Sequence, residues 1–78
     1  MISRYGIFCK VAELGSFTRA AESCGYSQSA ISQNIKALEQ ETGVSLLSRR
    51  KDGVQLTADG RDFFPYLQAV WQAEQALE

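Results

Sequence analysis

Residues 16–39 constrain the fold of this chain most, because they contain two short helical patterns separated by a tight turn. Ser16 and Ser27 each occupy a favoured N-cap position, and Gly25 lies between the two patterns. Glycine readily adopts the left-handed backbone conformation that a sharp helix end requires. The pattern therefore predicts one helix from Ser16 to the residue before Gly25 and a second over residues 27–42, ended by Gly43.

The apolar spacing predicts which sides of these helices are buried. The second helix places Ile31, Ile35 and Leu38 on one inward face. The first helix has the same spacing of i, i+3, i+4 and i+7, and its inward stripe is Phe17, Ala20, Ala21 and Cys24. Because the alanines on these faces are small, we expect the two helices to cross closely.

The flanking segments complete a small domain of the mainly α class. Residues 3–14 are a third helical pattern closed by Gly15, and apolar residues around its circumference predict packing between two other elements. Residues 46–56 read as a β-hairpin, since Asp52-Gly53 between apolar runs is a strong turn signal. Thr57 is the N-cap of a long fourth helix, which Pro65 should kink or loosen. We predict a winged helix-turn-helix of three helices plus a short β-hairpin wing (residues 1–57), followed by a long linker or dimerisation helix (58–78).

Composition argues against an enzyme and against a metal or cofactor site. The 78 residues include no histidine, the commonest general base and metal ligand, and two cysteines alone do not form a zinc site. For Cys9 and Cys24, buried free thiols are expected in preference to a redox switch. The sequence contains neither a secretory signal nor an apolar run long enough to cross a membrane, so we expect a cytoplasmic location and no membrane partner. The net charge is −1, but residues 1–57 carry +2 and residues 58–78 carry −3.

The outward face of the 27–42 helix is polar and almost uncharged. Amide, hydroxyl and ammonium groups on such a face can hydrogen-bond base edges in a major groove. After a preceding helix and a sharp turn, this favours DNA reading over an ordinary solvated surface. The candidate base-reading residues are Gln28, Ser29, Ser32, Gln33 and Lys36.

Other side chains are candidates for contact with the DNA backbone. Thr18 and Arg19 lie in the first turn of a helix, where backbone amides favour a phosphate, although capping and surface exposure are the alternatives. Ser27 has the same two interpretations, with capping preferred. The basic run Arg49-Arg50-Lys51 suits a wing on the backbone or minor groove, or a charged strand edge that discourages aggregation.

The fourth helix carries an apolar side too large for a free helix. Phe64, Leu67 and Trp71 are its candidate dimer-interface residues, although the first helix could cover them instead. A dimer would also double the weak positive charge and present two reading helices to one duplex.

Together these motifs resemble the N-terminal domain of LysR-type transcriptional regulators. The matching segments are GSFTRAAE at 15–22, SQSAISQNIKALE at 27–39, GVSLLSRR at 43–50 and VQLTADG at 54–60. The resemblance implies a sequence-specific module for double-stranded DNA, an inverted-repeat operator, and a homodimer or higher homo-oligomer formed through the C-terminal helix. It also implies an effector ligand bound only by a C-terminal domain absent from these residues, so that the chain is expected to be a fragment ending within or near the linker helix.

The resemblance also carries individual roles. It implies base reading by the five candidates on the 27–42 helix, and phosphate contacts near Thr18, Arg19, Ser27 and Thr57. It implies a wing contact through Arg49 and Arg50. The sequence departs from the family at four positions: Ser29 replaces a frequent proline, Gln33 a frequent arginine, Leu47 a phenylalanine and Asp59 an alanine. The alternative function is a winged-helix module for protein contact or dimerisation, which the low net charge favours.

Overall fold

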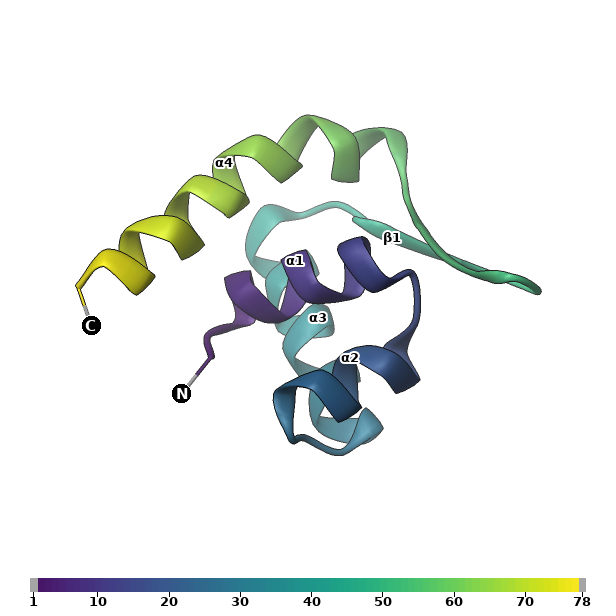
Figure 1. Cartoon of the computed structure of the whole chain (residues 1–78). Coiled ribbons are helices and arrows are strands. Elements are labelled where there is room, and N and C mark those ends of the chain that lie inside the picture. Colours follow the sequence, from purple (N-terminus) through teal and green to yellow (C-terminus); the bar gives the residue numbers. More distant parts are fainter. Residues whose placement is uncertain (1, 78) are drawn as a thin grey trace.

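A computed structural model of the chain describes residues 2–77, and it confirms the predicted winged helix-turn-helix with an appended helix (Figure 1). The elements follow the predicted order. They are α1 (Arg4–Leu14), α2 (Phe17–Cys24), α3 (Gln28–Thr42), β1 (Leu47–Arg50), β2 (Gly53–Leu56) and α4 (Ala58–Ala76). Met1 and Glu78, the outermost residues of the two predicted segments, lie outside the described residues.

Local capping explains where the helices begin and end. Each helix is preceded by a hydroxyl side chain that accepts a hydrogen bond from a backbone N–H three residues further on; these N-caps are Ser3, Ser16, Ser27 and Thr57. Gly15, Gly25 and Gly43 end the first three helices in the left-handed conformation. The predicted boundaries of these helices are therefore confirmed.

Helix α1 is the centre of the hydrophobic core. It packs against α2, α3 and α4, as its apolar circumference predicted. Ile7, Phe8 and Val11 on α1 are fully buried, and Ile31 on α3 and Leu46 before the hairpin are fully buried beside them. Figure 1 shows α1 lying between α4 on one side and the α2–α3 pair on the other.

The hairpin is confirmed with slightly shifted bounds. Its strands are antiparallel, with Leu47 opposite Leu56 and Arg50 opposite Gly53, so the connecting loop is Lys51-Asp52. The predicted strand start at Leu46 is one residue early. The hairpin is attached to the helical core because the Val54 N–H donates to the Gly15 carbonyl at 3.0 Å.

Helix α4 lies across α1, which covers part of the apolar side predicted as a dimer face. Leu67 is 7% exposed, and Phe64 and Trp71 pack against the core of their own chain. The Phe64 ring lies 6.0 Å from the Phe8 ring, centroid to centroid. Of the two covers that the sequence left open, α1 therefore provides one, while Phe64 and Trp71 remain half-buried. The exposed large apolar side chains are Tyr66, Val70 and Leu77.

Two polar contacts hold α4 along α1. The Ser3 hydroxyl donates to the Glu74 carboxylate at 2.5 Å, and the Lys10 ammonium lies 5.8 Å from the centroid of the Trp71 ring.

Helix α4 is continuous from Ala58 to Ala76, so the kink or loosening predicted at Pro65 does not break it.

The cysteines differ in burial. Cys9 is buried on α1, as predicted, and burial raises the pKa of its thiol to about 11, with a smaller contribution from Glu13. Cys24 is only half-buried, so the prediction of full burial is wrong for it. Cys24 is the last residue of the short helix α2, where the adjoining turn leaves it partly uncovered.

Candidate nucleic-acid interface

The turn between α2 and α3 fixes the orientation of α3. Gly25 has φ of 73°, and the next N–H, that of Tyr26, donates back to the Ala21 carbonyl at 3.0 Å. The Ser27 hydroxyl accepts from the Ala30 N–H at 3.1 Å and starts α3 only two residues after the turn glycine. Because both helix ends are satisfied locally and the turn is short, α3 follows α2 directly and packs against it.

The predicted reading face lies on the outside of α3. Ile31, Ile35 and Leu38 are buried on the inner side of this helix. On the outer side, four of the five candidate base readers are exposed and the fifth, Ser32, is half-buried: Gln28, Ser29, Gln33 and Lys36 are the exposed four. This face offers amide and hydroxyl groups with one ammonium, so it can both donate and accept hydrogen bonds.

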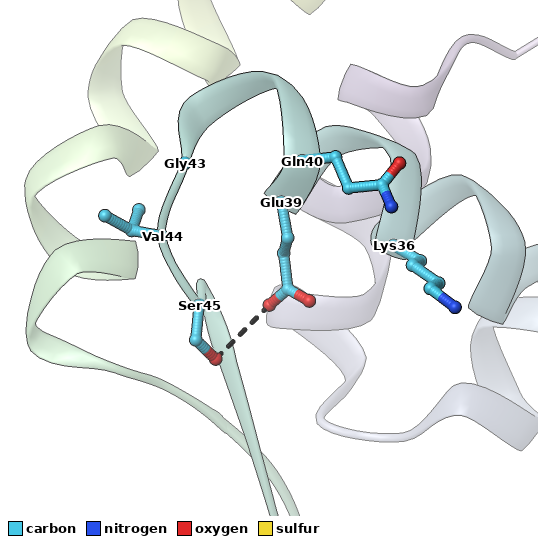
Figure 2. Close-up of a pocket in the computed structure, with 6 residues that line it drawn as sticks. All are labelled: Lys36, Glu39, Gln40, Gly43, Val44 and Ser45. Carbon is cyan, nitrogen blue, oxygen red and sulfur yellow. Dashed lines mark hydrogen bonds between the residues drawn. The ribbon is translucent and has the colours of Figure 1, made fainter.

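The hairpin is positioned on α3 by a carboxylate that sequence reasoning missed. Glu39, near the end of α3, accepts from the Leu46 N–H at 2.7 Å and from the Leu47 N–H at 3.3 Å. Ser45 also donates to it at 3.5 Å, and Figure 2 shows Glu39 pointing towards Ser45. A carboxylate in the last turn of a helix opposes the helix dipole. That mismatch is the sequence signal that could have indicated a bonded, structural role.

A shallow depression of about 420 Å³ lies beside this carboxylate, between the end of α3 and the start of the hairpin (Figure 2). Its lining residues are Lys36, Glu39, Gln40, Gly43, Val44 and Ser45. A second depression, of about 260 Å³, lies between α3, the first residue of α2 and the wing. The side chains of Lys36 and Arg49 both line the second depression, so the reading face and the wing meet there.

Arg49 does not extend freely from the wing. Its guanidinium carbon lies 4.0 Å from the centroid of the Phe17 ring, at the start of α2. Its Nη2 donates to the Ser32 hydroxyl on α3 at 3.3 Å. All three residues of the basic run are exposed, but these contacts are made by Arg49 and not by Arg50 or Lys51 at the wing tip. The structure therefore separates the run into one arginine facing α3 and two outer cations.

The candidate backbone contacts also divide into two groups. Thr18 and Arg19 are exposed in the first turn of α2, next to the Ser16 cap. Ser27 caps α3, as its preferred interpretation predicted. Thr57 has a structural role: its hydroxyl donates to the Ser45 carbonyl at 2.6 Å and accepts from the Gly60 N–H at 2.9 Å. Its one hydroxyl proton is used in the bond to Ser45, so a phosphate contact by this side chain would have to replace that bond.

The described residues, 2–77, limit two other kinds of site. Within that part of the chain, no group of three or more His, Cys, Asp or Glu side chains is placed to hold a metal ion. None of the helices described there is both long enough and apolar enough to cross a membrane.

The chain resembles known bacterial regulators over most of its length. The family model described as "Bacterial regulatory helix-turn-helix protein, lysR family" matches residues 2–61. The HTH-type transcriptional regulator CrgA of Neisseria meningitidis serogroup C (strain 8013) is 40% identical over 72 residues, which is 92% of this chain and 24% of CrgA. The chain thus spans about a quarter of the length of the curated relatives it matches.

Solved structures of similar domains include two with DNA. The CbnR_DBD–DNA complex matches with a TM-score of 0.85 and 33% identity, over 94% of this chain and 84% of that one. The BenM_DBD/benA site 1 DNA complex matches with a TM-score of 0.83 and 31% identity, over 95% of this chain and 86% of that one. Because the family model covers both the α2–turn–α3 unit and the wing, the chain belongs to the lysR family of bacterial regulatory helix-turn-helix proteins.

Proposed function

We propose that this chain is the sequence-specific reading module for double-stranded DNA of a LysR-type transcriptional regulator, and that it binds without catalysing a reaction. The observation that carries the proposal is the outer face of α3, where five polar side chains lie opposite a fully apolar inner face. The two similar domains solved as DNA complexes support the same function. In this proposal α3 enters the major groove and the wing lies on the backbone or in the minor groove.

Each part of the interface has a separate task. Gln28, Ser29, Ser32, Gln33 and Lys36 are proposed to contact base edges. Thr18 and Arg19, beside the free N–H groups at the start of α2, are proposed to hold a phosphate, with Ser27 adjacent. Arg50 is proposed to bind the backbone through the wing, because it is exposed and has a delocalised charge.

A second copy of the chain completes the proposed reader. One copy has few cations near α3, whereas two copies double the charge and present two reading helices to an inverted repeat. We propose that the copies meet through α4. Tyr66 is 72% exposed and Leu77 is 89% exposed on this helix, so the contact would use its outer side.

Other parts of the proposed biology follow from the relatives. Because they are about four times as long as this chain, an effector ligand is proposed to act through a further domain of such a regulator. A DNA partner also agrees with the cytoplasmic location predicted from the sequence.

The test is fluorescence anisotropy with labelled duplexes over a salt series. A pool of random duplexes is first taken through rounds of selection, and the selected duplex is compared with a scrambled duplex of the same composition. We expect binding that weakens as salt rises and a preference for the selected duplex, with inverted half-sites. Equal and negligible binding to every duplex at low salt would overturn the proposal and favour a protein-contact module.

A matched pair of variants separates reading from anchoring. Gln33→Ala is expected to relax base preference at one position, at a cost of about 1–3 kcal/mol there. Arg50→Ala is expected to weaken binding to all duplexes alike and to lower the salt slope by about one. If Gln33→Ala instead weakened every duplex equally, its assignment as a base reader would be wrong.

A further inference from the structure

Arg49 connects three separate parts of the interface. It belongs to strand β1, its guanidinium lies over the Phe17 ring at the start of α2, and its Nη2 donates to Ser32 on α3. The hydrogen bond from Arg49 Nη2 to Ser32 Oγ is 3.3 Å long and joins residues 17 positions apart in the sequence. Arg49 is therefore held on two sides, by an aromatic face and by a hydroxyl acceptor.

This bond constrains how Ser32 can meet a base. A guanidinium has N–H donors and no acceptor, whereas a serine hydroxyl has one donor and two lone pairs. When Arg49 occupies a lone pair, the hydroxyl proton has to point away from the guanidinium. Among residues 2–77, the Ser32 hydroxyl has a side-chain hydrogen bond with Arg49 and with no other residue. Its proton is therefore available to a group outside the chain.

The positive charge acts in the same direction. A base amino group carries partially positive hydrogens, and a guanidinium next to Ser32 repels them. A purine N7 carries a lone pair that faces the major groove and is attracted by both the hydroxyl proton and the guanidinium. Guanine O6 and thymine O4 are acceptors there too, but N7 is the acceptor that both purines present, whereas cytosine presents an amino donor.

We propose that Arg49 is a positioning residue that makes Ser32 a hydrogen-bond donor to a purine N7. The inference rests on the proposed function, since it assumes that α3 reads the major groove. It changes the role expected for Arg49, from wing contact with the backbone to control of base preference. Arg50 and Lys51 then remain as the wing residues for the backbone.

The test uses 7-deazapurines, in which N7 is replaced by a C–H group. Each purine of the selected duplex is replaced in turn, and the dissociation constant is measured by anisotropy. For the unaltered chain, we expect one position at which the replacement weakens binding about three- to tenfold, the range of a single net hydrogen bond. In Ser32→Ala this penalty should disappear, with the other positions unchanged.

Two variants then test the role of Arg49 itself. Arg49→Met keeps a long, unbranched side chain but removes the N–H donors and the positive charge. Phe17→Leu keeps Arg49 but removes the aromatic ring beneath its guanidinium. Both are expected to reduce the Ser32-dependent penalty to less than about twofold. In the matched control Arg50→Met, binding to all duplexes should weaken while the penalty at that position stays unchanged. Because Phe17→Leu leaves Arg49 in place, it also covers the case in which Arg49→Met fails to fold.

The outcomes separate the two proposals. If no duplex can be selected at all, the proposed function falls and this inference falls with it. If a duplex is selected but the Ser32-dependent penalty is absent, or is the same in both Arg49→Met and Phe17→Leu as in the unaltered chain, only the role of Arg49 is overturned. A penalty that shrinks in Arg50→Met as much as in Arg49→Met would also overturn it, because the effect would then be one of general charge.

Discussion

Replacing Gly60 by alanine tests how closely α4 approaches the hairpin. Gly60 is buried in the first turn of α4, where the helix passes over the carbonyl of Leu46. A Cβ at this position would lie 2.1 Å from that carbonyl oxygen and 3.2 Å from Cδ2 of Leu56. Non-bonded heavy atoms pack best at about 3.5 Å or more, so either the helix or the carbonyl has to move by about 1 Å.

The carbonyl cannot move without breaking other contacts. The Leu46 carbonyl accepts a hydrogen bond from the Thr57 N–H at 3.0 Å, and the Leu46 N–H donates to the Glu39 carboxylate. Alanine has a better helix propensity than glycine by about 1 kcal/mol, which alone would stabilise the variant. Overpacking against backbone costs about 1–3 kcal/mol, and loss of the Thr57 bond about 1 kcal/mol more. We therefore expect Gly60→Ala to lower the free energy of unfolding by about 2 kcal/mol.

Thermal unfolding followed by far-ultraviolet circular dichroism measures this effect. For a domain of this size, a loss of about 2 kcal/mol lowers the Tm by about 8–16 °C. The control is Gln72→Ala, an exposed position in the same helix, for which we expect a change within about 0.5 kcal/mol. An unchanged or higher Tm for Gly60→Ala would refute the reasoning, because helix propensity would then outweigh a clash that the structure requires.

Three further predictions concern the Thr57 cap, the Glu39 carboxylate and the buried Cys9 thiol. Thr57→Val, which removes the cap of α4 and the bond to Ser45, should cost about 1–2 kcal/mol by the same thermal melts, while Thr57→Ser should recover most of it. Glu39→Ala should speed amide hydrogen exchange at Leu46 and Leu47, and unchanged exchange there would show that Glu39 does not hold the wing. Because burial raises the pKa of Cys9 from 9.0 to about 11, its contribution to stability is complete below pH 9.0 and is lost as the pH rises towards about 11. Urea unfolding across this range should show a steeper loss for the unaltered chain than for Cys9→Ala, and parallel curves would contradict the assignment.

The helices could be predicted from the sequence because their ends depend on nearby residues. Ser16 and Ser27 cap helices through backbone groups three residues away, and Gly25 needs only its own backbone freedom. The outward position of Gln28 and Gln33 followed equally directly, since helical spacing sets them opposite the buried isoleucines. In each case the deciding interactions lie within a few turns of one helix.

The remaining features depend on contacts between distant residues. An apolar stripe on α4 fits either α1 or a partner chain, and only the packing of Leu67 and Phe64 in the folded chain shows that α1 covers it. Local sequence likewise places Arg49 on the wing but does not indicate that the Phe17 ring, 32 residues earlier, lies within its reach. The role of Glu39 depends on the path of the chain after Gly43. Such contacts follow from the assembled fold rather than from any one segment.

The low net charge, which first favoured a protein-contact module, is compatible with a DNA reader once the cations are located. In the proposed complex, Lys36 is the charged member of the reading face, and the other exposed cations are Arg19 on α2 and Arg50 and Lys51 on the wing. Three phosphate contacts would give a salt slope of only about −2.7 for one copy and about twice that for two. Weak attraction to every phosphate lowers the affinity for non-specific DNA, while the neutral hydrogen bonds of Gln28, Ser32 and Gln33 retain base preference. Under this proposal, a weakly charged reader would gain selectivity from its uncharged face and would need a second copy for affinity.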